Sequence, residues 1–130
     1  MAIDRTHEAP LANPWPIGSR GPRVVCEAFA ALMRCGRDVP ELAVRSVSRD
    51  FGLPVPYEER PAAAHQARLE ALDAIVGRVQ RGMGVRLVCW CYPRRCHGED
   101  VRRRVYELIA DAERAAEAPS RRRKRARRQR

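Results

Sequence analysis

Residues 85–100 read VRLVCWCYPRRCHGED, and this stretch carries the strongest fold signal in the chain. Its first part, Val85–Trp90, is apolar apart from one arginine, which is typical of a short buried strand. A polar loop follows. A helix is then predicted from about Glu99 to Glu117, because five apolar residues recur there at helical spacing (Val101, Val105, Leu108, Ile109 and Ala112). The sequence therefore predicts a strand–loop–helix unit over residues 85–117.

Three further helices are predicted before this unit. The first covers residues 22–35, where a proline suits the first turn and a glycine follows the end. The second covers residues 38–51, with Asp38 as N-cap, Glu41 three residues later and Gly52 as the stop signal. The third covers residues 62–81. Apolar stripes at helical spacing mark the first and third (Val25, Phe29, Leu32 and Met33; Leu69, Leu72, Ile75, Val76 and Val79).

Residues 1–22 contain four prolines and are predicted to be an irregular arm. The centre of this arm is apolar, so we expect Trp15 and Ile17 to pack onto the body. Residues 11–117 are then a single small α/β domain, rich in helix and with a short sheet. Because one strand cannot form a sheet, a second is expected from the arm, from residues 42–57 or from a partner chain.

The net charge of +10 over 130 residues is concentrated at the C-terminus. Residues 120–130 hold eight basic residues and no acid, which leaves 18 basic against 16 acidic residues in the rest of the chain. Pro119 is expected to end the last helix, so residues 118–130 are predicted to be a disordered, arginine-rich tail. Such a tail fits salt-dependent, sequence-blind binding to nucleic acid through residues 121–130. The alternative is a solubilising tail with no specific partner.

The chain is expected to be cytoplasmic and to have no membrane partner. No apolar run approaches the roughly 20 residues that span a bilayer, and the N-terminus lacks the apolar centre of a signal peptide. The five cysteines are an odd count, and disulfides are rare in a reducing compartment. A cluster of cysteine and histidine in such a chain therefore points to metal binding or to a reactive thiol.

The loop of residues 89–99 has three interpretations. In the first, Cys96 is a nucleophile and His97 an acid or base, supported by Glu99. The start of the following helix and the neighbouring arginines would lower the pKa of this thiol from about 8.5. In the second, zinc is bound by a set of four residues (Cys89, Cys91, Cys96 and His97), although the spacing is unusually tight for one tetrahedral ion. In the third, the cysteines fill the core and His97 caps the helix.

Two motifs give the chain a resemblance to the domain of unknown function family 4326, which is common in bacterial and phage genomes. The first is Asn13-Pro-Trp-Pro-Ile-Gly18, followed by Arg23, and the second is Cys89-Trp-Cys-Tyr-Pro-Arg-Arg-Cys-His-Gly-Glu99. The resemblance covers roughly Leu11 to Leu108. The second loop is also similar to one in the uncharacterised family 488.

The resemblance implies a small α/β domain in which the two motifs meet at one site. At such a site Asn13 would hydrogen-bond a ligand, Trp15 would stack on it or shield the loop, and Arg23 would hold an anion. Gly98 would let the backbone approach closely. This arrangement suggests that the protein binds a nucleotide-like or other anionic ligand, or catalyses a reaction on it. The alternative for the first motif is that Asn13-Pro14 forms a turn while Trp15 fills the core. The alternative for the function is a non-enzymatic, zinc-stabilised protein associated with nucleic acid.

Overall fold

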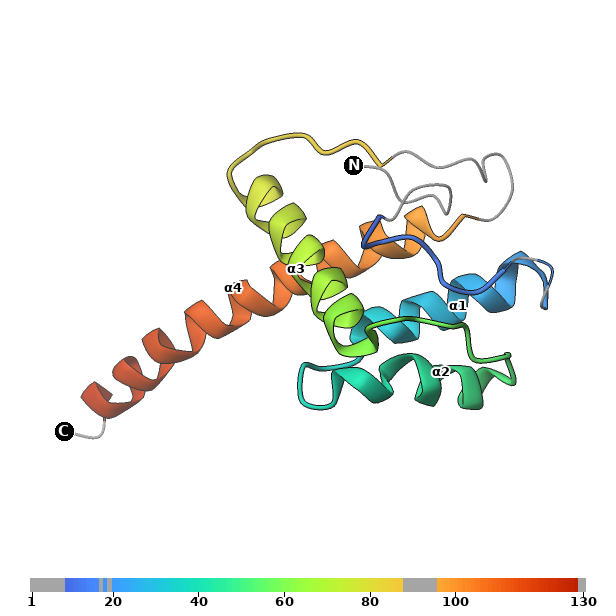
Figure 1. The fold of residues 1–130 in the computed structure, drawn as a ribbon. Helices are drawn as coiled ribbons and strands as arrows, with labels where there is room; N and C mark the ends of the chain where they lie inside the picture. The colour runs from blue at the N-terminus through green and yellow to red at the C-terminus, as the bar shows by residue number, and fades with distance from the viewer. Residues whose placement is uncertain (1–8, 17, 19, 88–95, 129–130) are drawn as a thin grey trace.

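The computed structural model describes residues 9–16, 18, 20–87 and 96–128, with residues 118–127 described by their backbone alone. The helices found in these ranges are α1 (Gly21–Arg34), the short 3-10 helix η2 (Pro40–Leu42), α2 (Ala43–Phe51), α3 (Pro61–Gln80) and α4 (Gly98–Arg128). Helix α1 packs against both α2 and α4, while α3 packs against α4 and η2 (Figure 1). The body is thus a small helical bundle closed by the N-terminal arm.

The predicted α/β architecture is wrong, because the described residues contain helices and no strand. Residues 85–87 of the predicted strand follow an irregular path, and its remaining residues, 88–90, lie outside the described ranges. Val85 and Leu87 are half-buried against the core, so the apolar pattern reflects burial rather than strand pairing. A strand needs a hydrogen-bonded neighbour. Among the residues described, neither segment of the chain that was expected to supply a second strand forms one. The described part of the arm is irregular, and residues 42–57 are largely helical.

Two of the predicted helices are confirmed to within one residue at each end. Both α1 and α3 carry proline in the first turn, where the missing N–H costs nothing, and their predicted apolar stripes are buried or half-buried. The second helix begins later than predicted: Asp38 does not cap it, and α2 starts at Ala43 after η2. Its predicted end is confirmed by Gly52, whose φ of 63° is in the left-handed region.

Helix α4 does not end at Pro119 as expected, but continues as far as Arg128. The helix is 31 residues long, about 46 Å at 1.5 Å per residue. Proline costs about 3 kcal/mol in a helix interior, but the surrounding alanine, glutamate and arginine residues are strong helix formers. The helix is also nucleated by its packed N-terminal part, so only propagation is needed beyond it. In the described ranges, no helix is both long and apolar enough to cross a membrane.

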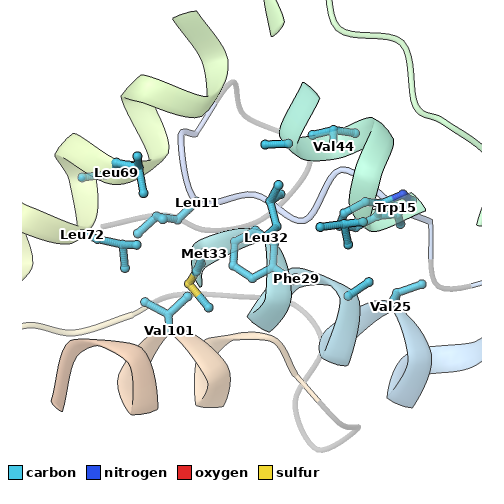
Figure 2. Packing of buried hydrophobic residues seen from close by; sticks show 14 of the residues in the cluster. Leu11, Trp15, Val25, Phe29, Leu32, Met33, Val44, Leu69, Leu72 and Val101 are labelled. Atoms are coloured by element: carbon cyan, nitrogen blue, oxygen red, sulfur yellow. The ribbon is translucent and has the colours of Figure 1, made fainter. Parts of the chain in front are cut away.

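The core forms where α1 lies between α2 and α4 (Figure 1). Phe29 and Leu32 of α1 are fully buried, and Met33 lies next to Val101 of α4 (Figure 2). The arm contributes Leu11 and other buried groups to the same cluster, so it is part of the folded body rather than a linker.

A buried polar network joins α3 to the segment before it. His65 is fully buried, and its Nε2–H donates to the carbonyl of Cys35 at 3.2 Å. Its Nδ1 lies 3.5 Å from the Arg68 guanidinium, which can only donate. Arg68 in turn forms a buried ion pair with Glu58. Burial lowers the pKa of His65 and the nearby Arg68 adds to this effect, while the carbonyl hydrogen bond opposes it.

We expect acid to destabilise the protein through His65. Because the pKa of His65 is lower in the folded state, the unfolded chain takes up the proton first, and stability falls as the pH drops below about 6.5. Urea unfolding at pH 7.5 and pH 5.5 measures the loss. The variant His65→Gln, which keeps a side-chain N–H donor, should lose less stability between the two pH values. An equal loss in both proteins would contradict this assignment.

Candidate functional site

Cys96 lies directly before α4, at the N-terminal end of that helix. Its side chain is buried, and its Sγ accepts a hydrogen bond from the backbone N–H of Gly98 at 3.3 Å. Its carbonyl accepts a further bond from the N–H of Glu99 at 3.2 Å. Cys96 therefore accepts hydrogen bonds from two of the backbone N–H groups at the start of α4 that have no acceptor within the helix. A sulfur in this position is stabilised when it is negatively charged.

His97 links the arm to α4. It is 4% exposed, and its Nε2 lies 3.0 Å from the carbonyl oxygen of Leu11. Because a carbonyl only accepts, Nε2 is the protonated ring nitrogen. The ring also meets Phe29 edge to face, with centroids 4.9 Å apart. The arm, two residues before the first motif, thus contacts the end of the second motif through a hydrogen bond between Leu11 and His97.

Glu99 and Asp100 occupy the first turn of α4. The side chain of Glu99 is exposed, whereas Asp100 is buried and its Oδ1 lies 3.8 Å from Arg103. Carboxylates at this end are stabilised by the helix dipole. They also compete with any anionic ligand for the same positive potential. The N–H of Gly98, the glycine expected to admit a ligand, is bonded to sulfur.

Asn13 and Trp15 hold the arm on the body. The Asn13 side chain donates to the carbonyl of Val25 at 2.9 Å and accepts from the backbone N–H of Trp15 at 3.1 Å. Trp15 is 1% exposed, and its indole N–H donates to the hydroxyl of Ser48 at 3.0 Å. These contacts match the alternative in which the motif forms a turn and the indole fills the core. With its ring covered, Trp15 offers no stacking face in this structure.

Arg23 lies apart from these contacts on the surface of α1. Its side chain is 86% exposed and pairs with Glu27 one turn later at 3.1 Å. Such an exposed pair contributes little to stability, so the guanidinium can exchange Glu27 for another anion at low cost. Nothing among its described contacts connects it to Cys96 or His97.

The four-residue zinc set is only partly within the described ranges, because Cys89 and Cys91 lie outside them. Among the residues that are described, no group of three or more histidine, cysteine, aspartate or glutamate side chains is arranged to hold a metal ion. The Leu11 hydrogen bond also occupies Nε2 of His97. A metal at this position would therefore have to use Nδ1 of the ring.

The hydrogen-bond partners that fix the arm on the body were not predicted from the sequence. Ser48 is fully buried in α2, and the carbonyls of Leu11 and Val25 accept bonds from side chains distant in sequence. The one available signal was a serine within an apolar helical face, since a buried hydroxyl there needs a partner.

The C-terminal part of α4 is a second candidate site. Beyond its contacts with α1 and α3, the helix extends away from the body as far as Arg128 (Figure 1). Residues 111–117 are exposed. Residues 121–128 contain seven basic residues and no acid. The backbone of this basic segment is therefore helical as far as Arg128.

Comparison with known proteins gives one family match. The family model described as "Domain of unknown function (DUF4326)" matches residues 1–107, which include both motifs and the start of α4. No curated protein and no solved structure matches the chain. The likeness of the loop to family 488 stays a prediction. The match extends over most of the chain and joins the arm, the helical body and the Cys96–His97 junction in one unit, so the chain belongs to the DUF4326 family.

Proposed function

We propose that the protein binds nucleic acid through residues 121–128 at the end of α4. The observation that carries this proposal is the continuation of α4 as one helix through Arg128 with seven basic residues in its last eight positions. Helical geometry compresses these charges into about 12 Å of axis. An extended tail would spread them over about 26 Å.

The compressed charge matches that of a duplex. Double-stranded DNA carries one phosphate per about 1.7 Å of axis, so about seven phosphates fall within the same 12 Å. The DNA major groove, about 12 Å wide, also admits an α-helix. Basic residues that repel one another four positions apart weaken an isolated helix, and phosphates relieve that repulsion. Duplex DNA is therefore the favoured partner, with RNA duplexes less suited because their major groove is deep and narrow.

The affinity of the protein for duplex DNA would not depend on the base sequence of the DNA. Contacts from arginine and lysine to phosphates position a protein without reading bases. The 119 residues before Ser120 carry 18 basic against 16 acidic residues, so the body adds little to the long-range attraction.

Titration of labelled duplex DNA with the full chain, followed by fluorescence anisotropy at about 100 mM salt, tests the proposal. We expect saturable binding that is the same for two duplexes of scrambled sequence, and weaker binding to a duplex RNA of equal length. A chain that leaves the anisotropy of every probe unchanged would disprove the proposal. A strong preference for one sequence would contradict the phosphate-only mode.

A second proposed function concerns the Cys96–His97 junction, as a site that binds or acts on a nucleotide-like or other anionic ligand. Its support is the hydrogen bond from the Gly98 N–H to Cys96 Sγ, which favours a charged, reactive sulfur beside an imidazole. The carboxylates of Glu99 and Asp100 oppose an anion there, so a ligand would need to bring compensating contacts. The rival for the same sulfur is a zinc-stabilised loop.

Elemental analysis of the full chain, purified without chelator or affinity tag, separates these two interpretations. About one zinc per chain, with unfolding of Cys96→Ser, is expected for the metal site, because metal binding there is part of the folding free energy. A metal-free chain in which a thiol reagent labels Cys96 fastest is expected for the ligand site. In that case Cys96→Ser folds normally and loses the labelling. A metal-free chain whose Cys96 is inert would contradict both.

A further inference from the structure

A cavity of about 310 Å³ lies on the side of the body formed by η2 and α2. One wall is η2 and the first turn of α2, with Glu41 and Arg45. The other is the segment of residues 55–61, which runs back along α2 towards the start of α3 (Figure 1). The volume is at the lower end of the range for small-molecule sites, about 300–1,000 Å³. None of these residues belongs to the Cys96–His97 junction or to the basic end of α4.

The cavity holds charged groups of both signs that the described residues leave without partners. Glu41 and Arg45 are exposed and form no hydrogen bond or ion pair within the described ranges. Glu58 also lines the cavity, and it is anchored through Oε2 by the buried guanidinium of Arg68. Its other oxygen, Oε1, is buried and has no hydrogen-bond partner within the described residues.

The remaining surface is apolar. Val44, Val55, Pro56 and Pro61 line the cavity, and Tyr57 stands at its edge with 90% of its surface exposed. Of the large apolar side chains exposed on the described surface, Val55 and Tyr57 line this cavity. Such a surface buries the apolar part of a ligand.

From this arrangement we propose that the cavity binds a small amphoteric molecule with an apolar body, of the class of free α-amino acids with aliphatic or aromatic side chains. The ligand ammonium is placed beside the exposed carboxylate of Glu41, with Glu58 on the opposite wall. The ligand carboxylate pairs with Arg45, whose planar guanidinium fits two oxygens. The apolar side chain lies on Val55 and Pro56, with Tyr57 folding over it.

The charge pattern favours a free amino acid over the end of a peptide. A peptide N-terminus brings only the ammonium and a peptide C-terminus brings only the carboxylate, so each leaves one side of the cavity without a partner. A purely anionic ligand, such as a phosphate, would face two carboxylates. The charge-blocked derivatives of one amino acid therefore distinguish these sources directly.

The test is titration of the full chain with L-phenylalanine, followed by two-dimensional amide NMR. We expect saturable shifts that map to residues 41–61. N-acetyl-L-phenylalanine and L-phenylalaninamide, which each lack one charge, should bind about tenfold more weakly or worse, since each loses one charge-assisted contact. Absence of saturable shifts with phenylalanine and with leucine would overturn the proposal. Equal affinity for a blocked derivative and the free amino acid would also overturn it, in favour of a peptide end.

Variants locate the site. Arg45→Gln and Glu41→Gln should each weaken phenylalanine binding by about tenfold, because the side chains are exposed and their loss leaves the fold intact. Arg78→Gln and Glu70→Gln are matched controls, since these exposed residues of α3 do not line the cavity. We expect both controls to bind as the unaltered chain does. Equal weakening in the controls and the cavity variants would show that general charge, rather than this cavity, governs binding, and would overturn the assignment.

Discussion

Replacing Phe29 with alanine is expected to destabilise the folded chain by about 3–5 kcal/mol. Phe29 is fully buried at the centre of α1, within the cluster to which the arm, α2, α3 and α4 all contribute. The substitution would leave a cavity that a small body cannot refill, and would also remove the ring on which His97 packs. Because domains are stable by only about 5–15 kcal/mol, the loss is a large fraction of the total.

Urea unfolding of the Phe29→Ala variant, followed by tryptophan fluorescence, measures this loss, because Trp15 is buried in the same core. Phe51→Ala serves as the comparison, since Phe51 is only half-buried at the end of α2 and should cost clearly less. A Phe29→Ala variant that unfolds within about 1 kcal/mol of the unaltered chain would contradict the placement of α1 at the centre of the core.

Neutralising the basic end of α4 is expected to weaken binding to duplex DNA by at least about 100-fold near 100 mM salt. The change converts five consecutive residues to glutamine (Arg121, Arg122, Arg123, Lys124 and Arg125). Glutamine keeps helix propensity close to that of arginine, so the helix remains while the charge is lost. The physical reason is that each phosphate contact releases counterions from the duplex, and the variant loses up to five such contacts.

The matched control removes the same number of charges from exposed positions of the helical body and its loops (Arg49, Arg60, Arg78, Arg81 and Arg102, each to glutamine). This control should lose only a few-fold in affinity through the change in net charge. Anisotropy titration of both proteins decides the question. Similar losses in the two variants would mean that overall charge, and not the end of α4, carries the binding.

Local sequence pattern was enough to predict much of the helical body. The apolar spacing of α1 and α3 identified both helices and the residues that they bury, because helical period and burial act together in an amphipathic helix. The same approach failed at residues 85–87, where an apolar, β-branched run indicated a strand. Strand formation depends on a pairing partner that pattern alone does not supply. Pro119 was expected to end the last helix, because proline disfavours a helix interior. The helix continues through it, since strong helix formers lie on both sides.

The sequence identified which residues form the candidate site, but not what each of their side chains does. The motifs around Trp15 and His97 were identified, and His97 contacts the arm at Leu11, two residues before the first motif. Whether Asn13 faced a ligand or the backbone depended on its hydrogen-bond partners, here Val25 and Trp15. Side-chain hydrogen bonds of this kind are set by tertiary packing, so the sequence left both alternatives open. The cavity beside α2 joins residues 41–45 to residues 55–61 in the same way.

The dependence of DNA affinity on salt shows whether the basic end of α4 carries the binding to duplex DNA. The dissociation constant is measured between about 50 and 200 mM salt for the full chain and for the five-glutamine variant. If the end of α4 provides five to seven phosphate contacts, the slope of log affinity against log salt for the full chain is about −4.5 to −6.3, and the variant is less steep by up to about 4.5. Equal slopes for the two proteins would contradict the claim that residues 121–128 carry the interaction.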